Sequence, residues 1–300
     1  MVTNGWETFW SSTDSDEVLV NESGSNNATL EAFWRDHLAL VSDRSRVIDV
    51  ACGAGSVLRK IHQPPDLCVG VDVSISALRR VSETSKGAAT VVADCSTLPF
   101  PSQSFDFVFS QFGVEYAGIP AFLECSRLLA PGGVLKFLVH CKESAIQRSV
   151  ARDLATVQTI LRAGFFDAAK QLTQALSSKV ESEVQSAAER FNIAEAALRS
   201  EVPIAPTNFA GYAYLGYQKL LRQWNQYDPS DVLSWLTGMQ VEAESAAERL
   251  SNMQGAALDD AKLTEINTAL SHAQFPVLEK RAVAALDSDT WIAWELSQCI

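Results

Sequence analysis

The chain has no cluster of basic residues. Its 24 lysines and arginines are outnumbered by 36 aspartates and glutamates, which gives a formal net charge of −12. Such a chain repels a phosphate backbone and lacks the basic face that nucleic-acid binding requires. Nucleic acid is therefore not expected as a partner.

The cysteines form no CxxC pair and no spacing typical of metal ligands. The six occupy positions 52, 68, 95, 125, 141 and 299, several of them inside apolar runs, and we expect buried thiols in a reducing compartment and no metal site. No apolar run reaches the roughly 18 residues of a membrane span, and the first residues lack the basic and then apolar order of a signal peptide. These absences predict a cytoplasmic protein without membrane contact.

Short apolar runs alternate with helical segments through the first half of the chain. They cover residues 47–50, 68–73, 90–93, 105–109 and 134–140. Continuous runs rich in Val, Ile and Phe are typical of parallel strands covered on both faces, and their alternation with helices predicts an α/β doubly wound sheet. We expect this Rossmann-like core to span residues 27–141.

The remaining segments differ from this core. Residues 142–270 carry apolar positions three and four apart and predict a large helical insertion. Residues 271–300 return to strand character, since Ile292, Trp294 and Leu296 alternate with smaller or polar residues, so a final strand pair would complete a seven-stranded sheet whose last strand is antiparallel. Residues 1–26 place Trp6, Phe9 and Trp10 at helical spacing before a polar, hinge-like stretch.

Small residues and carboxylates occur at the predicted carboxyl ends of the strands. VIDVACGAG, residues 47–55, ends the first strand in a turn with two glycines, and Asp72 ends the second strand. Ligands of open parallel sheets bind at this edge, glycine lets a backbone approach them closely, and a carboxylate after the second strand can accept both ribose hydroxyls. Asp94 follows the third strand, and a Pro-Gly-Gly turn at 131–133 precedes the fifth.

In this order the motifs resemble the class I S-adenosylmethionine-dependent methyltransferases, most closely those that methylate small molecules. The resemblance implies S-adenosylmethionine as cofactor and S-adenosylhomocysteine as product. It implies that the first turn wraps the methionine part, that Asp72 holds the ribose, that Val73 flanks the adenine, and that Asp94 with the backbone of Cys95 reads the adenine edge. The implied contacts to the methionine part are Asp49, Ala51, Gly53, Gly55, Ser110 and Gln111, with Ala51 standing where the family usually has its first glycine.

Acceptor recognition is predicted from aromatic and titratable residues. His140, which ends the predicted fifth strand, is the candidate general base, although a histidine that only caps a strand fits the same position. The aromatic stretch 208–227 suits either a pocket wall or a helix core. The candidate acceptor contacts are Trp10, Tyr116, Tyr212, Tyr214 and Tyr217, and residues 1–26 with the 142–270 insertion are expected to act as a lid.

The predicted function is methyl transfer to a small organic acceptor by in-line displacement. This reaction depends on the alignment of acceptor and methyl group more than on a nucleophilic residue of the protein. Three alternatives remain open at this point. A nicotinamide-dependent oxidoreductase would show a third glycine, where Ser56, Val57 and Leu58 follow instead. The others are a non-catalytic regulatory module that binds the cofactor or its product, and a transferase of another group from the same cofactor. The sequence does not specify the acceptor, the methylated atom, the pathway or the oligomeric state.

Overall fold

The computed structural model describes residues 3–12, 25–286 and 290–299. The chain forms two compact units: Met1–Arg148 with Asn252–Ile300, and Ser149–Ser251. It enters the second unit within α5 (Ala145–Arg162) and leaves it within α9 (Pro229–Ala256). We call the first the sheet unit and the second the helical unit.

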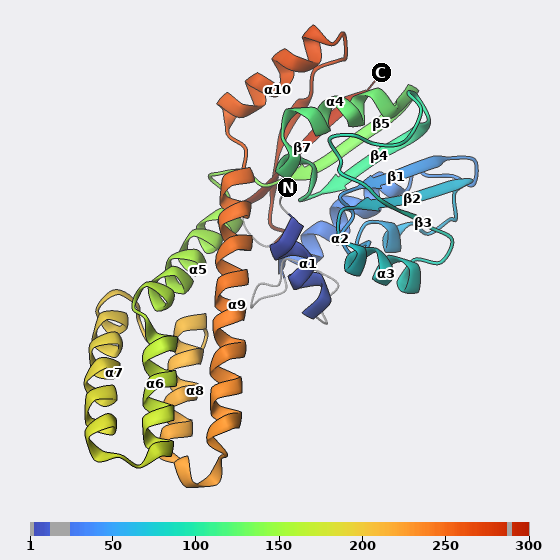
Figure 1. Cartoon of the computed structure of the whole chain (residues 1–300). Coiled ribbons are helices and arrows are strands. Elements are labelled where there is room, and N and C mark those ends of the chain that lie inside the picture. Colours follow the sequence, from blue (N-terminus) through green and yellow to red (C-terminus); the bar gives the residue numbers. More distant parts are fainter. Residues whose placement is uncertain (1–2, 13–24, 287–289, 300) are drawn as a thin grey trace. The chain divides into compact units, whose positions relative to one another are not determined.

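A seven-stranded sheet forms the centre of the sheet unit, in the order β3-β2-β1-β4-β5-β7-β6. The strands β1 to β5 are parallel, whereas β7 pairs antiparallel with both β5 and β6, as in the predicted fold class (Figure 1). Their bounds are β1 (Arg46–Val50), β2 (Leu67–Asp72), β3 (Ala89–Val92), β4 (Phe105–Gln111), β5 (Leu129–Val139), β6 (Glu279–Ala284) and β7 (Trp291–Cys299).

One strand differs from the sequence prediction in its start. We expected the fifth strand to begin at residue 134, after the Pro-Gly-Gly turn, but β5 already begins at Leu129. Leu129 pairs with Phe105, and the register shifts before Val134 pairs with Phe107. Gly132, at φ 76°, lies within this irregular stretch, so the turn interrupts the register without ending the strand.

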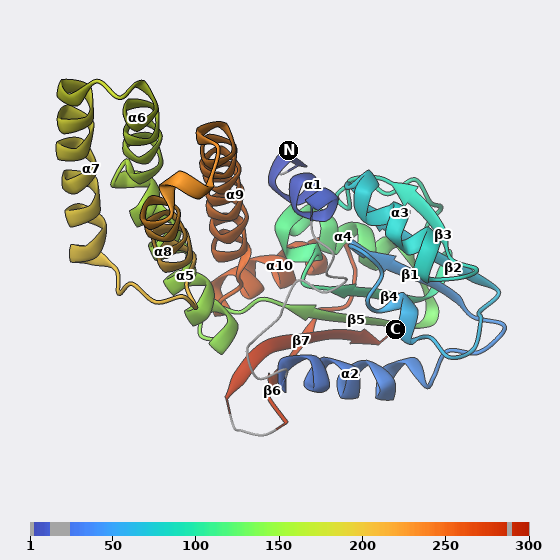
Figure 2. The ribbon, with the colours of Figure 1, turned by 90° about the horizontal axis from the view of Figure 1, so that it is seen from below.

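Helices cover both faces of the sheet. In Figure 2, α4 (Ile119–Leu128) and α10 (Asp260–His272) lie on one side of β4, β5 and β7, and α2 (Ser25–Leu38) lies on the other. Phe122, Leu263 and Ile266 pack into the main core with the strands, while the Trp34 ring contacts Phe109 from the α2 side. Further helical elements are α1 (Thr3–Ser12), α3 (Ile75–Thr84) and the single turns η1 (Leu58–Lys60) and η2 (Val114–Ala117).

The helical unit has a core of its own. Its complete helices are α6 (Phe165–Ser178), α7 (Glu181–Glu201) and α8 (Phe209–Arg222), and a short turn, η3 (Trp224–Gln226), follows α8. Phe165, Phe191 and Tyr217 contact one another at its centre. At the start of α8 the Asn208 side chain accepts a hydrogen bond from the Gly211 amide at 2.7 Å. A Cβ on Gly211 would lie 1.9 Å from the Ala205 carbonyl oxygen, so only glycine fits there.

Candidate functional site

The turn after β1 is built on backbone conformations that favour glycine. Gly53 and Gly55 have φ values of 51° and 80°, and Ala51 adopts φ 54°, a left-handed conformation that costs an alanine roughly 1–2 kcal/mol. A Cβ on Gly113 would lie 2.5 Å from the Ala51 Cβ. The alanine that replaces the usual first glycine is therefore accommodated by a glycine on the neighbouring loop.

Asp49 lies inside β1 with a side chain that has no hydrogen-bond partner among the described residues. The residue is only 1% exposed, and neither carboxylate oxygen accepts a hydrogen bond from any residue that the structure describes. Burial, and secondarily the charge of Asp72, raise the pKa of the Asp49 carboxyl well above its ordinary value. A buried acceptor without a donor costs about 1–3 kcal/mol, and a bound group that donates hydrogen bonds or carries positive charge would remove this cost.

Asp72 ends β2 beside this turn. Its Oδ2 accepts a hydrogen bond from the Gly53 amide at 2.8 Å, and its Oδ1 accepts one from the Ser74 amide at 2.9 Å. Burial raises the pKa of the carboxyl, although these backbone hydrogen bonds act in the opposite direction. An ionised carboxylate offers about four acceptor positions, so acceptor capacity remains for hydroxyl donors of a ligand. Val73, the next residue, is 40% exposed and available for an apolar contact.

Asp94 and Cys95 follow β3 at the same edge. The Asp94 Oδ1 accepts hydrogen bonds from the Ser96 amide and hydroxyl at 2.8 and 2.7 Å, which lower the pKa of Asp94. Cys95 is buried, and burial raises the pKa of its thiol to about 12. The thiol therefore stays protonated, and what Cys95 can offer a ligand is its backbone.

Ser110 and Gln111 end β4 and are both engaged within the protein. The Ser110 hydroxyl accepts a hydrogen bond from the Val114 amide at 3.1 Å. Gln111 accepts from the Trp34 indole at 2.5 Å and donates to the Ser56 hydroxyl at 3.1 Å. Gln111 thus ties α2 to the turn after β1, and its predicted contact to the methionine part of a cofactor stays a prediction.

Two buried ionisable groups lie beyond β4 and β5. The Glu115 Oε1 accepts a hydrogen bond from the His140 amide at 2.9 Å, while its Oε2 and both ring nitrogens of His140 have no partner among the described residues. The His140 ring stacks on Phe112 at 4.5 Å and meets the Tyr116 ring edge-on at 6.1 Å. Burial raises the pKa of Glu115 to about 7 and lowers that of His140 to about 3.

Glu115 follows β4 in the chain but is not a solvated loop residue, because it is only 4% exposed. The single turn η2 begins at Val114, separated from the end of β4 by two residues, and Val114 and Glu115 are both buried in it. In the sequence, Glu115 stands between Val114 and Tyr116, shortly after a buried strand. No spacing rule separates a buried from an exposed glutamate in so short a turn.

Helix α1 packs onto the ends of three strands. The Glu7 carboxylate accepts hydrogen bonds from the hydroxyls of Ser74 and Ser76, at 2.6 and 2.5 Å, beside the start of α3. The Trp10 ring is so close to Gly53 that a Cβ there would lie 2.7 Å from it. The Trp6 ring contacts Tyr116 edge-on at 5.6 Å. Glu7 was not predicted as a site residue, although it lies three residues before Trp10 on the same side of a helix.

The predicted acceptor contacts fall into two groups. Trp10 and Tyr116 belong to the sheet unit and lie at the strand ends. Tyr212, Tyr214 and Tyr217 belong to α8 of the helical unit, where Tyr212 is 56% exposed, Tyr214 lines a pocket and Tyr217 is fully buried. The Tyr217 hydroxyl is hydrogen-bonded to Thr173 and to the Ala169 carbonyl, so this tyrosine is a part of the helical core.

Among the described residues, no group of three or more His, Cys, Asp and Glu side chains is arranged to hold a metal ion. Nor does any described helix combine the length and hydropathy needed to span a membrane.

These features define an open α/β sheet with carboxylates and a glycine-containing turn at the carboxyl ends of its strands, the edge at which such sheets bind their ligands. Residues 48–137 match the family model of a methyltransferase domain. The core is thus a class I S-adenosylmethionine-dependent methyltransferase domain. The helical unit lies outside the matched residues.

Similar proteins match about two fifths of the chain. A malonyl-[acyl-carrier protein] O-methyltransferase of Salmonella typhimurium is 27% identical over 123 residues, 39% of this chain and 49% of that protein. The ubiquinone/menaquinone biosynthesis C-methyltransferase UbiE of Bordetella parapertussis is 34% identical over 124 residues, 37% of this chain and 48% of that protein. A solved S-adenosylmethionine-dependent methyltransferase from Mesorhizobium loti is 26% identical, with a TM-score of 0.36, over 40% of this chain and 57% of that one. The chain spans about half the length, or less, of these two curated relatives.

Proposed function

We propose that the protein transfers the methyl group of S-adenosylmethionine to a small organic acceptor. The observation that carries the proposal is a pair of buried carboxylates on adjacent strands: Asp49, inside β1 and without a hydrogen-bond partner among the described residues, and Asp72, at the end of β2 with acceptor capacity left. The match of residues 48–137 to a methyltransferase domain supports it independently. The similar proteins include an O-methyltransferase of malonyl-[acyl-carrier protein] and a C-methyltransferase of ubiquinone/menaquinone biosynthesis, so both oxygen and carbon acceptors are open to this chain.

The residues at the strand ends fit an adenosyl amino acid. Asp49 would receive the positively charged ammonium of the methionine part, which supplies the donors that its oxygens lack. Asp72 would accept the ribose hydroxyls, while Asp94 and the Cys95 backbone would contact the adenine edge. When bound, S-adenosylmethionine supplies an already activated sulfonium methyl, so the protein's task is to align the acceptor with it.

Glu115 is a better proton acceptor than His140, the candidate from the sequence. A base works best when its pKa lies near the operating pH, as the value of about 7 for Glu115 does. The pKa of about 3 keeps the His140 imidazole neutral and makes it a weak base. We therefore propose that Glu115 takes the proton of an acceptor that must lose one, and that His140 orients it through its backbone amide.

Calorimetric titration with S-adenosylhomocysteine and with NAD tests the cofactor assignment. We expect S-adenosylhomocysteine to bind and NAD not to bind. Asp72→Ala should lower the affinity for S-adenosylhomocysteine roughly 10- to 100-fold. It removes charge-assisted hydrogen bonds of about 1.5–3 kcal/mol each, which water replaces in part. Asp43→Ala is the matched control, since Asp43 is exposed and lies before β1, away from the strand ends. Binding of NAD alone would overturn the proposal.

Turnover distinguishes the enzyme from a non-catalytic cofactor-binding module. The full chain is incubated with S-adenosylmethionine labelled in its methyl group and with pools of hydroxyl, amine, thiol and activated-carbon acceptors. Label in any product supports methyl transfer. Binding of S-adenosylhomocysteine without label transfer to any pool would favour the regulatory alternative.

The lid is a further proposal. Residues 1–26 and the 142–270 insertion are proposed to restrict access to the acceptor, which would exclude water from the reaction. The contacts of Glu7, Trp6 and Trp10 with the strand ends support the N-terminal part of it, while the hinge expected at 11–26 lies largely outside the described residues. Hydrogen exchange should show added protection in α1 and in part of 203–230 when S-adenosylhomocysteine binds; unchanged exchange in both would contradict the lid.

A further inference from the structure

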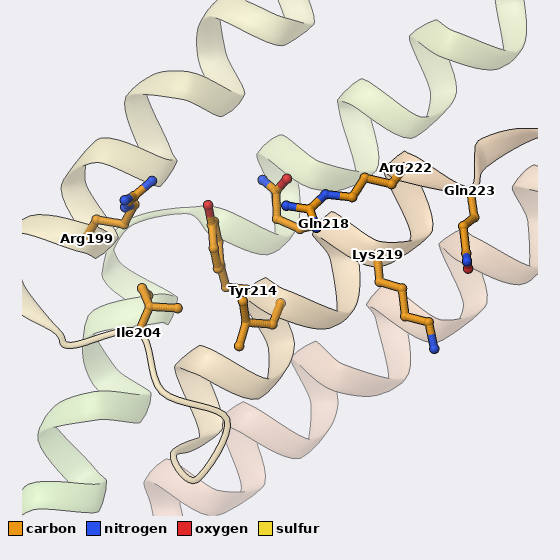
Figure 3. A pocket seen from close by; sticks show the side chains of 8 residues that line it. Arg199, Ile204, Tyr214, Gln218, Lys219, Arg222 and Gln223 are labelled. Atoms are coloured by element: carbon orange, nitrogen blue, oxygen red, sulfur yellow. The ribbon is translucent and has the colours of Figure 1, made fainter.

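The helical unit has a pocket of its own, of about 470 Å³, along one side of α8 (Figure 3). Tyr214, Gln218 and Arg222 follow one another at steps of four residues and therefore form one row on the helix surface. Arg199 at the end of α7 and Ile204 from the following connection complete this wall. Each of these residues belongs to the helical unit.

The charge of this pocket differs from that of the whole chain. Arg199, Lys219 and Arg222 line it, in a protein whose formal net charge is −12. Arg199 is paired with Glu195 at 3.4 Å, and the same carboxylate accepts the Tyr214 hydroxyl at 2.5 Å. Over the residues that the structure describes, neither Lys219 nor Arg222 takes part in an ion pair. The pocket therefore carries more positive than negative charge.

The donors are arranged on one side of the pocket. In Figure 3 the Arg222 guanidinium lies beside the Gln218 amide, and the Tyr214 hydroxyl lies between them and Arg199, whereas Lys219 points the other way. Cations in the last turn of α8 also complement the helix dipole, but that role does not require an arginine from α7 on the same wall. The Tyr214 ring and Ile204 add apolar surface next to the donors.

We propose that this pocket binds a small organic anion, with a phosphate or carboxylate held by Arg222, Gln218 and Arg199 and an apolar body on Tyr214 and Ile204. Guanidinium groups present forked donors that match both oxyanions, and planar apolar surface beside them selects an organic ligand over a bare ion. None of the pocket residues belongs to the sheet unit, which holds the strand-end carboxylates. It does not depend on the proposed methyl transfer.

Calorimetric titration of the full chain with phenyl phosphate, benzoate and neutral benzyl alcohol tests the proposal without any cofactor. We expect at least one of the two anions to bind about tenfold or more tightly than benzyl alcohol. Whichever anion binds more tightly identifies the charged group. Inorganic phosphate should bind more weakly than phenyl phosphate, because it lacks the apolar body.

Arg222→Gln and Arg199→Gln should each weaken the binding of the more tightly bound anion about tenfold, because each removes one charge-assisted contact. Arg190→Gln is the matched control, since it makes the same charge change at an exposed position of α7 outside the pocket. Circular dichroism establishes that each variant is folded. Equal binding of the anions and benzyl alcohol, or equal weakening by Arg190→Gln and Arg222→Gln, would overturn the proposal.

Discussion

Replacing Glu115 by glutamine should change how the stability of the protein depends on pH. Burial raises the pKa of the Glu115 carboxyl from an ordinary 4.5 to about 7, so the folded protein holds this proton more tightly than the unfolded chain does. The stability contribution of the neutral form is complete below about pH 4.5 and is lost as the pH rises through about 7. Glutamine mimics the neutral form at every pH.

The magnitude follows from the two pKa values. A tenfold difference in proton affinity corresponds to ~1.4 kcal/mol, so ionising Glu115 fully costs the folded protein about 3.4 kcal/mol. About 2.5 kcal/mol of this falls between pH 5 and pH 8.5. The groups beside Glu115 do not titrate in this interval, because the pKa of the Cys95 thiol is about 12 and that of His140 is about 3.

Urea denaturation of the wild type and Glu115→Gln at about pH 5 and about pH 8.5 measures the effect. The wild type should lose about 2.5 kcal/mol more of its free energy of unfolding than the variant does over this interval. Glu143→Gln is the matched control, since Glu143 is exposed in the same unit, and it should follow the wild type. If the Glu115→Gln and wild-type curves run parallel, Glu115 ionises freely in the folded state and is not the buried base proposed above.

Three further predictions concern other contacts. Gly113→Ala should destabilise the sheet unit by about 1–3 kcal/mol, because its Cβ would lie 2.5 Å from that of Ala51, and adding Ala51→Gly should recover part of the loss in the same denaturation assay. Glu7→Gln should speed amide exchange in α1 about two- to fivefold. The Glu7 charge at the start of α3 stabilises the docking of α1 by about 0.3–1 kcal/mol, and the substitution removes that charge. Unchanged exchange would mean that Glu7 does not hold α1 in place. Glu295→Gln should cost about 1–3 kcal/mol by leaving Lys136, now paired with it at 2.5 Å between β5 and β7, partly buried without a counter-charge; a loss below 1 kcal/mol would show that water reaches this pair.

The arrangement of the sheet could be predicted because each strand carries its own hydrophobic signal. The runs at 47–50 and 105–109 are continuous and are buried on both faces, while the alternation of Ile292, Trp294 and Leu296 matches a strand next to the edge of the sheet. Asp49 and Asp72 could be placed at one edge because parallel strands end on the same side.

Properties that depend on tertiary contacts could not be predicted in this way. Ala51 and Gly113 are 62 residues apart in number, and only the folded loop shows that one accommodates the other. Tyr214 and Tyr217 are the same residue type and lie three residues apart in one helix. Tyr214 nevertheless lines a pocket, whereas Tyr217 is fully buried in the helical core. Glu115 looks like a loop residue until the surrounding packing is known.

The contact between Trp10 and Gly53 gives the protein a built-in optical probe. An indole ring held against the turn after β1 emits according to the polarity and the quenching groups of that spot, and no label has to be attached to observe it. The difference between the emission of the wild type and that of Trp10→Phe isolates this single ring from the six other tryptophans. Stopped-flow recording of that difference would follow events at the turn in real time and would separate the arrival of a ligand from any later movement of α1.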